Sequence, residues 1–326
     1  MEMTGPAEDS GHRLQDGAAC VATVTRNGES DLVHSGFACL VDAAGKCLWS
    51  LGDPHSKAFF RSSAKPMQAL AMVECGAADA VGLDAADLAL ICGSHNGAPV
   101  HAERARIVLA KSGLGPEALR CGDGLADQCS GKHAGMLTAC RHLKLPTDAY
   151  LDAEHPWQRR MRDVICEYCG VDAGDCPTAV DGCSAPTLSL PVYNMALGFA
   201  RLGRAAGTRG PVERLFRAMA ENPHGHTGEP DMRPFPAEGH SGPFPAAIIT
   251  KGGANGLHCA AIPGLGLGFA LKVIDGSAAP RWPVLTRALR VAGLISEATA
   301  AAMRSALWPR IDTRRGEPAG EIRVEF

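Results

Sequence analysis

The chain has 326 residues, of which 46% are hydrophobic but only 5% aromatic, and it contains 38 glycines. This length can bury a large core in one or two domains, and the composition favours an interior of small aliphatic side chains with sharp turns. The formal net charge of -3, from mixed signs, gives no field that would attract nucleic acid or an anionic membrane.

Residues 1–16 are polar and partly acidic, and they lack the basic and apolar regions of a signal peptide. No apolar run approaches the ~20 residues that a membrane span requires. We therefore expect a cytoplasmic protein whose first ~15 residues are flexible. The 13 cysteines, an odd number scattered along the chain, are not expected to form a disulfide framework in that compartment.

The first half of the chain begins with strand patterns and continues with helical ones. Strands are predicted over 20–25, 36–41 and 47–51, with a hairpin turn at 42–46. The apolar segment 84–92 suits a buried helix or strand. Helices are predicted from near Ser62 to Gly76, and over 100–111, 134–143 and 155–169.

The second half returns to strands after further helices. A loop is predicted over 180–187, and a proline- and histidine-rich loop or lid over 222–245. Helices are predicted over 190–201, 212–221, 283–294 and 296–306. Strands are predicted over 246–250, 257–262, 266–274 and 322–326.

Strands at both ends of the chain enclose a helical middle. This order predicts an α+β sandwich in one domain over 1–326, with a mainly antiparallel sheet built from both termini and flanked by helices. The helical subdomain is expected over roughly 76–245.

A Ser-x-x-Lys pattern, Ser62 to Lys65, opens the first predicted helix. Residues three apart share one face of a helix, so the two side chains could meet. A lysine can remove a serine proton only when burial or nearby cations lower its pKa. The pattern is common in surface helices, so it indicates a nucleophile only together with other groups.

Two later motifs supply such groups. Ser94-His95-Asn96 follows the segment 84–92, and Lys251-Gly252-Gly253 ends a predicted strand. The order Ser-x-x-Lys, Ser-x-Asn, Lys-x-Gly is that of penicillin-recognising serine hydrolases, in which the second serine and lysine relay protons. Alone, each later motif is also ordinary turn or strand-end chemistry.

A second group of residues could bind a metal. Cys129 and His133 lie in the sequence Cys-Ser-Gly-Lys-His, and Asp181 precedes Cys183 in Asp-Gly-Cys. Thiolates with a histidine or an aspartate are ligands for zinc. Neither loop has the Cys-x-x-Cys spacing of structural zinc sites, so buried cysteines remain the alternative.

Asp181 is the best acidic candidate for binding a substrate ammonium group, since it lies at a glycine turn between apolar segments. The alternative is a purely structural Asx turn.

Five motifs together resemble one family. They are Arg61-Ser62-Ser63-Ala64-Lys65-Pro66, Cys92-Gly93-Ser94-His95, Cys129 to Leu137, Asp181 to Thr187, and Lys251-Gly252. The sequence resembles the asparaginase II family, the rhizobial-type or class 3 L-asparaginases, over about residues 25–274.

The resemblance implies a serine β-lactamase/glutaminase-like fold, a homodimer, and hydrolysis of L-asparagine to L-aspartate and ammonia. It implies one Ser-Lys tandem at Ser62 and Lys65 and a second at Ser94 and Lys251. It also implies an accessory zinc site. The zinc ligands would be Cys129, Lys132 and Cys183, with Asp181, Arg61 and His133 as substrate-binding residues.

Three other functions remain open. A glutaminase is one, because a pocket discriminates a single methylene by only ~1 to 3 kcal/mol. A β-lactamase-like or peptidase-like serine acylase is another. A non-catalytic zinc-binding protein, the third, would keep the metal site without turnover.

Overall fold

The computed structural model describes residues 16–223 and 248–326. The expected flexibility of the first residues, and nearly all of the expected loop at 222–245, fall outside these ranges. Within them, no helix is long and apolar enough to cross a membrane.

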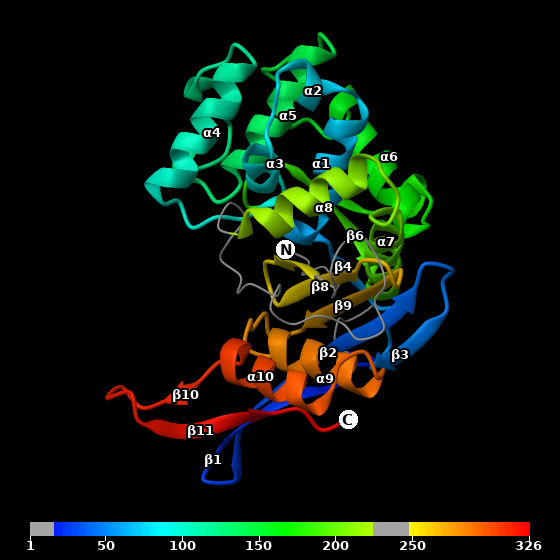
Figure 1. Ribbon diagram of the computed structural model, residues 1–326, viewed down its shortest axis with the longest axis vertical. Coiled ribbons are helices and arrows are strands. Elements are labelled where there is room, and N and C mark those ends of the chain that lie inside the picture. The colour runs from blue at the N-terminus through cyan, green and yellow to red at the C-terminus, as the bar shows by residue number, and fades with distance from the viewer. Residues whose placement is uncertain (1–15, 224–247) are drawn as a thin grey trace, which may run out of the picture.

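One antiparallel sheet joins the two ends of the chain (Figure 1). Its strands follow the order β10-β11-β1-β2-β9-β8-β7, and β3 pairs with β2 beside this path. The strands are β1 (Ala19–Arg26), β2 (Glu29–Asp42), β3 (Cys47–Leu51), β7 (Ile249–Gly253), β8 (Leu257–Ile262), β9 (Leu267–Val273), β10 (Ile311–Asp312) and β11 (Pro318–Arg323).

The pairing confirms the predicted α+β fold. Thr23 in β1 lies opposite Arg323 in β11, so the N-terminal hairpin and the C-terminal strand are neighbours. Phe37 in β2 lies opposite Lys272 in β9, which brings the returning strands beside the first ones.

Helices cover both faces of this sheet. α9 (Arg281–Val291) and α10 (Glu297–Leu307) pack on one face, where Phe269 belongs to their apolar cluster. α7 (Val192–Ala205) packs on the other face beside Ala270. Gly268 allows this approach, because a Cβ there would lie 2.0 Å from the Ala196 carbonyl oxygen. The strands therefore alternate between two apolar layers.

The remaining helices gather at the opposite end of the molecule (Figure 1). Four short 3₁₀ turns, η1 (Arg61–Ala64), η2 (Pro116–Ala118), η3 (Gly124–Ala126) and η4 (Ala173–Asp175), lie among these segments. The α-helices are α1 (Lys65–Glu74), α2 (Ala77–Ala80), α3 (Ala85–Cys92), α4 (Pro99–Lys111), α5 (Ser130–His142), α6 (Pro156–Cys169) and α8 (Pro211–Glu221).

Some predicted boundaries were wrong. The helix expected from Ser62 is a 3₁₀ turn at first, and α1 begins only at Lys65, with Pro66 in its first turn. Proline fits that turn because its nitrogen has no hydrogen to donate. The helix expected at Ala134 already begins at Ser130.

A small second sheet was not predicted. It joins β4 (Lys57–Phe59), β6 (Pro186–Pro191) and β5 (Thr178–Val180). Part of it lies in the segment predicted as a loop and a helix start. This sheet fixes the residues that follow β4 and β5, which include Arg61 and Asp181.

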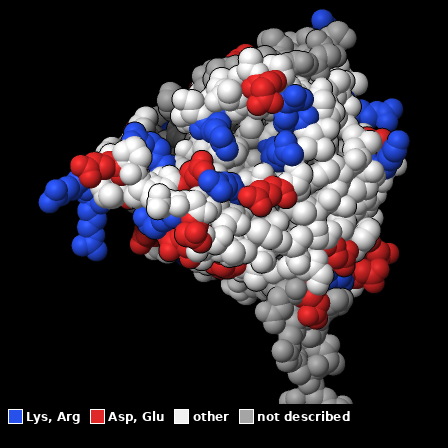
Figure 2. All heavy atoms as spheres, turned by 90° about the horizontal axis from the view of Figure 1, so that it is seen from below, with Lys and Arg blue, Asp and Glu red and all other residues white. Residues whose placement is uncertain are grey.

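Acidic and basic side chains are interspersed on the face shown in Figure 2. On this face no single sign of charge dominates, as the composition led us to expect.

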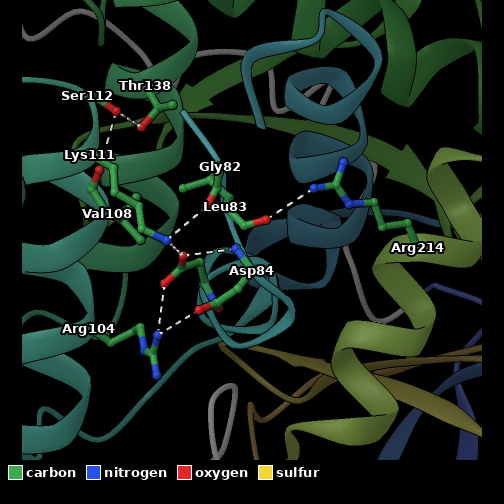
Figure 3. Close-up of polar contacts among 10 residues, drawn as sticks. Gly82, Leu83, Asp84, Arg104, Val108, Lys111, Ser112, Thr138 and Arg214 are labelled. Atoms are coloured by element: carbon green, nitrogen blue, oxygen red, sulfur yellow. Dashed lines mark hydrogen bonds and ion pairs between the residues drawn. The ribbon is translucent and has the colours of Figure 1, made fainter. Parts of the chain in front are cut away.

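A network of charged side chains anchors the start of α3, where Figure 3 labels Asp84, Arg104 and Lys111. Asp87 is fully buried. Its carboxylate forms ion pairs with Lys111 Nζ at 2.6 Å and with Arg104 Nη1 at 3.2 Å. Asp84 caps the helix by accepting from the Asp87 backbone N–H, and the Asp87 side chain accepts from the Asp84 N–H. α3 ends at Cys92, directly before Gly93-Ser94. The network therefore fixes the helix that positions Ser94.

We expect Asp87→Ala to lower the free energy of unfolding by about 3 kcal/mol, since it leaves two cations without their buried partner. Urea denaturation measures this change. Arg106→Gln is the control, because Arg106 and Glu103 form an exposed ion pair whose loss should have no measurable effect. Equal effects of the two substitutions would contradict the anchoring role.

Candidate active site

A cavity of about 400 Å³ lies where the helical end meets the sheet. Six separate parts of the chain line it, so only the fold brings them together. The lining residues are Arg61, Ser62, Ser94, Asp127, Gln128, Cys129, Asp181, Gly182, Cys183, Lys251, Gly252, Gly253, Ala254 and Arg281.

Arg61 and Asp181 form an ion pair on one wall. Arg61 Nε and Nη2 lie 2.8 and 2.7 Å from Asp181 Oδ1, and the Arg61 N–H donates to Thr187 Oγ1. Arg61 has a φ of 47°, a left-handed conformation that is uncommon for residues other than glycine. Asp181 Oδ2 has no hydrogen-bond partner among the described residues, so it can accept from a ligand.

The two adjacent serines differ in their surroundings. Ser62 is partly exposed and lines the cavity. Ser63 is fully buried, and its hydroxyl donates to the Lys251 backbone oxygen at 2.9 Å. Of these two serines, only Ser62 is therefore open to a substrate.

Lys65 is buried behind the cavity wall. Its Nζ donates to Gly93 O at 2.5 Å, Ser94 Oγ at 2.9 Å and Gln128 O at 3.3 Å. Within the described residues it forms no hydrogen bond with Ser62 Oγ, although the Lys65 backbone N–H donates to Ser62 O. Burial lowers the pKa of Lys65, as a general base requires.

Ser94 connects the two lysines. Its Oγ accepts from Lys65 Nζ at 2.9 Å and from Lys251 Nζ at 3.0 Å. Lys251 is buried on β7 and also donates to Gly252 O at 2.7 Å. Two lysines around one hydroxyl can deliver or remove a proton at Ser94.

The proposed metal ligands also meet. Lys132 Nζ lies 3.0 Å from Cys183 Sγ, and Cys129 and Cys183 are close enough to shift each other's pKa. The neighbouring Cys183 side chain, with help from the charges of Lys65 and Lys132, lowers the pKa of Cys129 to about 5. Burial alone would lower the pKa of Lys132, but the negative charge of the two cysteines outweighs it and raises the pKa.

This donor set suits zinc. Two sulfurs and one amine nitrogen are ligands that zinc accepts. No group of three or more His, Cys, Asp or Glu side chains in residues 16–223 and 248–326 could hold a metal ion. Lys132 would therefore have to supply the third ligand as a neutral amine.

Close helix packing positions this group. α5 begins directly after Cys129 and carries Lys132. A Cβ at Gly131 would lie 2.5 Å from the Leu90 carbonyl oxygen, so the glycine lets α5 approach α3. The approach brings Cys129 beside the segment that carries Ser94.

Two histidines in the motifs are buried in the helical end rather than lining the cavity. His133 Nδ1 lies 2.7 Å from Tyr150 OH, and its Nε2 has no partner among the described residues. Tyr150 OH also accepts from the Arg120 N–H, so it links His133 to the backbone at Arg120. His95 Nδ1 accepts from the Gly97 N–H, so its Nε2 donates to Ser130 Oγ. Burial lowers the pKa of His95 to about 4, and it holds the loop around Ser94 as a neutral ring.

Sequence reasoning missed several lining residues. Asp127 and Gln128 directly precede the Cys129 motif, and that adjacency was the available signal. Asp127 Oδ1 accepts from the Cys129 N–H at 2.7 Å. Arg281 comes from α9 and has no local motif.

Comparisons with known proteins identify relatives of the chain. The model of a family described as L-asparaginase II matches residues 22–324. No curated protein matches the chain.

Two solved structures are similar at low identity. A β-lactamase from Mycobacterium bovis is 16% identical, with 83% of this chain and 94% of that chain covered and a TM-score of 0.41. The native form of a protein named Mglu is 14% identical, with 83% of this chain and 63% of that chain covered and a TM-score of 0.41.

Proposed function

We propose that this chain, which belongs to the L-asparaginase II family, hydrolyses the side-chain amide of L-asparagine to L-aspartate and ammonia. Family membership supports an amidohydrolase. The observation that carries the mechanism is the cavity in which Ser62, Ser94 and Lys251 lie together, with Lys65 and Lys251 both bonded to Ser94.

In this proposal Ser62 Oγ attacks the amide carbon. In this proposal its proton passes to Lys65 by way of Ser94 Oγ, which accepts from Lys65 Nζ and lines the same cavity as Ser62. Gly252, Gly253 and Ala254 line the cavity, and their backbone N–H groups are candidates to stabilise the oxyanion. The role of Ser62 is favoured by its exposure to the cavity, while Ser63 is buried.

Collapse of the tetrahedral intermediate breaks the C–N bond. The leaving NH₂ group takes a proton from the Ser94 and Lys251 pair and departs as ammonia. Water then attacks the acyl-enzyme and gives its proton to the Ser94 and Lys251 pair. Lys65 returns its proton to the Ser62 oxygen as the ester bond breaks, and the products are L-aspartate and free Ser62. The Ser94 and Lys251 pair acts through the contact of 3.0 Å between Lys251 Nζ and Ser94 Oγ.

Asp181 would hold the substrate ammonium through Oδ2, while Arg61 fixes the carboxylate through Oδ1. Cys129, Lys132 and Cys183 would hold a zinc ion, which would fix their loops beside the cavity. Zinc is not needed to generate the nucleophile, because the serines provide it. His133, expected near the substrate, would act from behind the wall, and a homodimer remains a prediction from the family.

The test is ammonia release from L-asparagine and, separately, from L-glutamine by the purified protein. We expect L-asparagine to be the better substrate. A chain that releases ammonia mainly from L-glutamine would be a glutaminase. Failure to act on either amide, with hydrolysis of a β-lactam, would favour the acylase. Zinc binding without any turnover would favour a non-catalytic protein.

A further inference from the structure

A second cavity, of about 250 Å³, lies between α9, α10 and the segment that follows β11. Figure 1 shows α9 and α10 side by side, with the C-terminal residues beside α9. We call it the arginine cavity, because Arg287, Arg290 and Arg304 line it together with one acidic residue, Glu297. Among the described residues it shares no lining side chain with the candidate active site. Three guanidinium groups therefore meet a single carboxylate at a place that the proposed reaction does not use.

Two of these arginines lie on α9 and are held only at Nε. Arg287 and Arg290 are three residues apart, so they share one face of the helix. Arg290 Nε donates to Glu297 Oε2 at 3.0 Å, and Arg287 Nε donates to the Phe326 backbone oxygen. Among the described residues the terminal nitrogens of neither guanidinium have a hydrogen-bond partner. Each group is thus anchored at one edge and can donate to a ligand from the other.

The third arginine comes from α10 and is held by an aromatic ring. Arg304 Cζ lies 4.4 Å from the centre of the Trp308 ring, which is a cation–π contact. Trp308 is fixed in turn, because its Nε1 donates to Thr286 Oγ1 at 3.2 Å. In the described part of the chain no nitrogen of Arg304 has a hydrogen-bond partner. The ring therefore orients this guanidinium without using any of its donors.

We propose that the arginine cavity binds a phosphate dianion, either free or as the monoester of a small metabolite. A phosphate monoester carries a charge of about -1.5 to -2 at pH 7 and three acceptor oxygens. A guanidinium can donate two parallel hydrogen bonds to such a group. Three guanidiniums with unused terminal nitrogens match its charge and its three oxygens, whereas one carboxylate offers only two oxygens and a single charge.

The apolar part of the lining favours the monoester over free phosphate. Ala300, Ala301 and Val324 also line the cavity. Their side chains form no hydrogen bonds, so they suit the carbon skeleton that a monoester places beside its phosphate. Contact with that skeleton removes apolar surface from water. We therefore expect a monoester to bind more tightly than inorganic phosphate.

The experiment is calorimetric titration of the full chain at pH 7 and constant ionic strength, because salt screens exposed charges. The ligands are inorganic phosphate, ribose 5-phosphate, ribose as the carbon skeleton alone, and succinate as a dicarboxylate. Each is titrated into wild type, Arg304→Gln, Arg304→Lys and Arg314→Gln. Arg314 is the matched control, since it is an exposed arginine with no side-chain partner among the described residues and does not line the cavity.

We expect ribose 5-phosphate to bind wild type most tightly, inorganic phosphate to follow, and ribose and succinate to bind far more weakly. Arg304→Gln should raise the Kd of both phosphates about 10- to 100-fold, the range for lost hydrogen bonds to a charged group. Arg304→Lys should lose less affinity, because lysine keeps the charge without the planar fork. Arg314→Gln should bind as wild type does.

Wild type that binds neither phosphate at millimolar concentration would overturn the proposal. Equal affinity in Arg304→Gln and wild type would place the anion outside the arginine cavity, and equal weakening in Arg314→Gln would show an effect of net charge alone. Either result would also overturn it. Succinate that binds as tightly as ribose 5-phosphate would contradict recognition of phosphate. Tighter binding of inorganic phosphate than of the monoester would keep the anion site but contradict the role of the apolar lining.

Discussion

Ser62→Ala should abolish hydrolysis of L-asparagine, with a loss in kcat of about 10³-fold or more. Ser62 lies in η1, directly before α1, and it is the serine of this turn that lines the cavity. Without its hydroxyl no acyl-enzyme can form, and binding and oxyanion stabilisation alone leave only slow attack by water. Ammonia release, together with mass spectrometry of enzyme quenched during turnover, measures both the rate and the acylated residue.

Ser63→Ala is the matched control, since it removes the neighbouring hydroxyl and keeps the nucleophile. Ser63 Oγ donates to the Lys251 backbone oxygen, so its loss should cost about 1 kcal/mol of stability while turnover persists. If Ser62→Ala keeps wild-type turnover and Ser94→Ala loses it, Ser94 is the nucleophile. Such a result would assign the attack to the hydroxyl that contacts both lysines, instead of to Ser62.

Much of the fold was predictable because its patterns are local. The segment 257–262 is apolar except for His258, and the structure has β8 at the same residues. The segment 84–92 was open between helix and strand, and the capping box of Asp84 and Asp87 selects the helix. Strand patterns at both ends also predicted the sheet, since each needs a partner to bury one face.

The small sheet was not predictable from local patterns. Lys57–Phe59 and Thr178–Val180 are strands of three residues, too short to show alternation. Both pair with Pro186–Pro191, so the residues of β4 lie 130 to 134 positions from their partners along the chain. Tertiary packing rather than intrinsic preference decides such segments.

The site shows the same division. The motif order predicted which residues would meet, and Ser62, Ser94 and Lys251 do line one cavity. The partner of Lys65 was less predictable, because a long flexible side chain can reach several acceptors. Its Nζ lies at Gly93 O, Ser94 Oγ and Gln128 O, positions set by the approach of α3 and α5. Arg281 could be found only from the fold.

Lys132→Met should remove most of the zinc from the purified protein. Lys132 is buried, and its Nζ lies 3.0 Å from Cys183 Sγ. Methionine keeps the apolar stem but replaces the amine by a weak thioether ligand, so only two strong ligands remain. Metal content per chain, measured by elemental analysis of wild type and variant, gives the result. We expect near-stoichiometric zinc in the wild type and little in the variant.

Cys166→Ala is the control for this experiment. Cys166 is also a buried cysteine, but its sulfur lies 3.9 Å from Cys176 Sγ in another part of the helical end, so zinc content should not change. Full zinc in Lys132→Met would show that the amine is not a ligand. Its role would then be the ion pair with Cys129 and Cys183, and breaking that pair should lower the free energy of unfolding by about 3 to 5 kcal/mol. Loss of zinc with asparagine turnover retained would instead separate the metal from catalysis, because the serine nucleophile and both lysines near Ser94 remain in place.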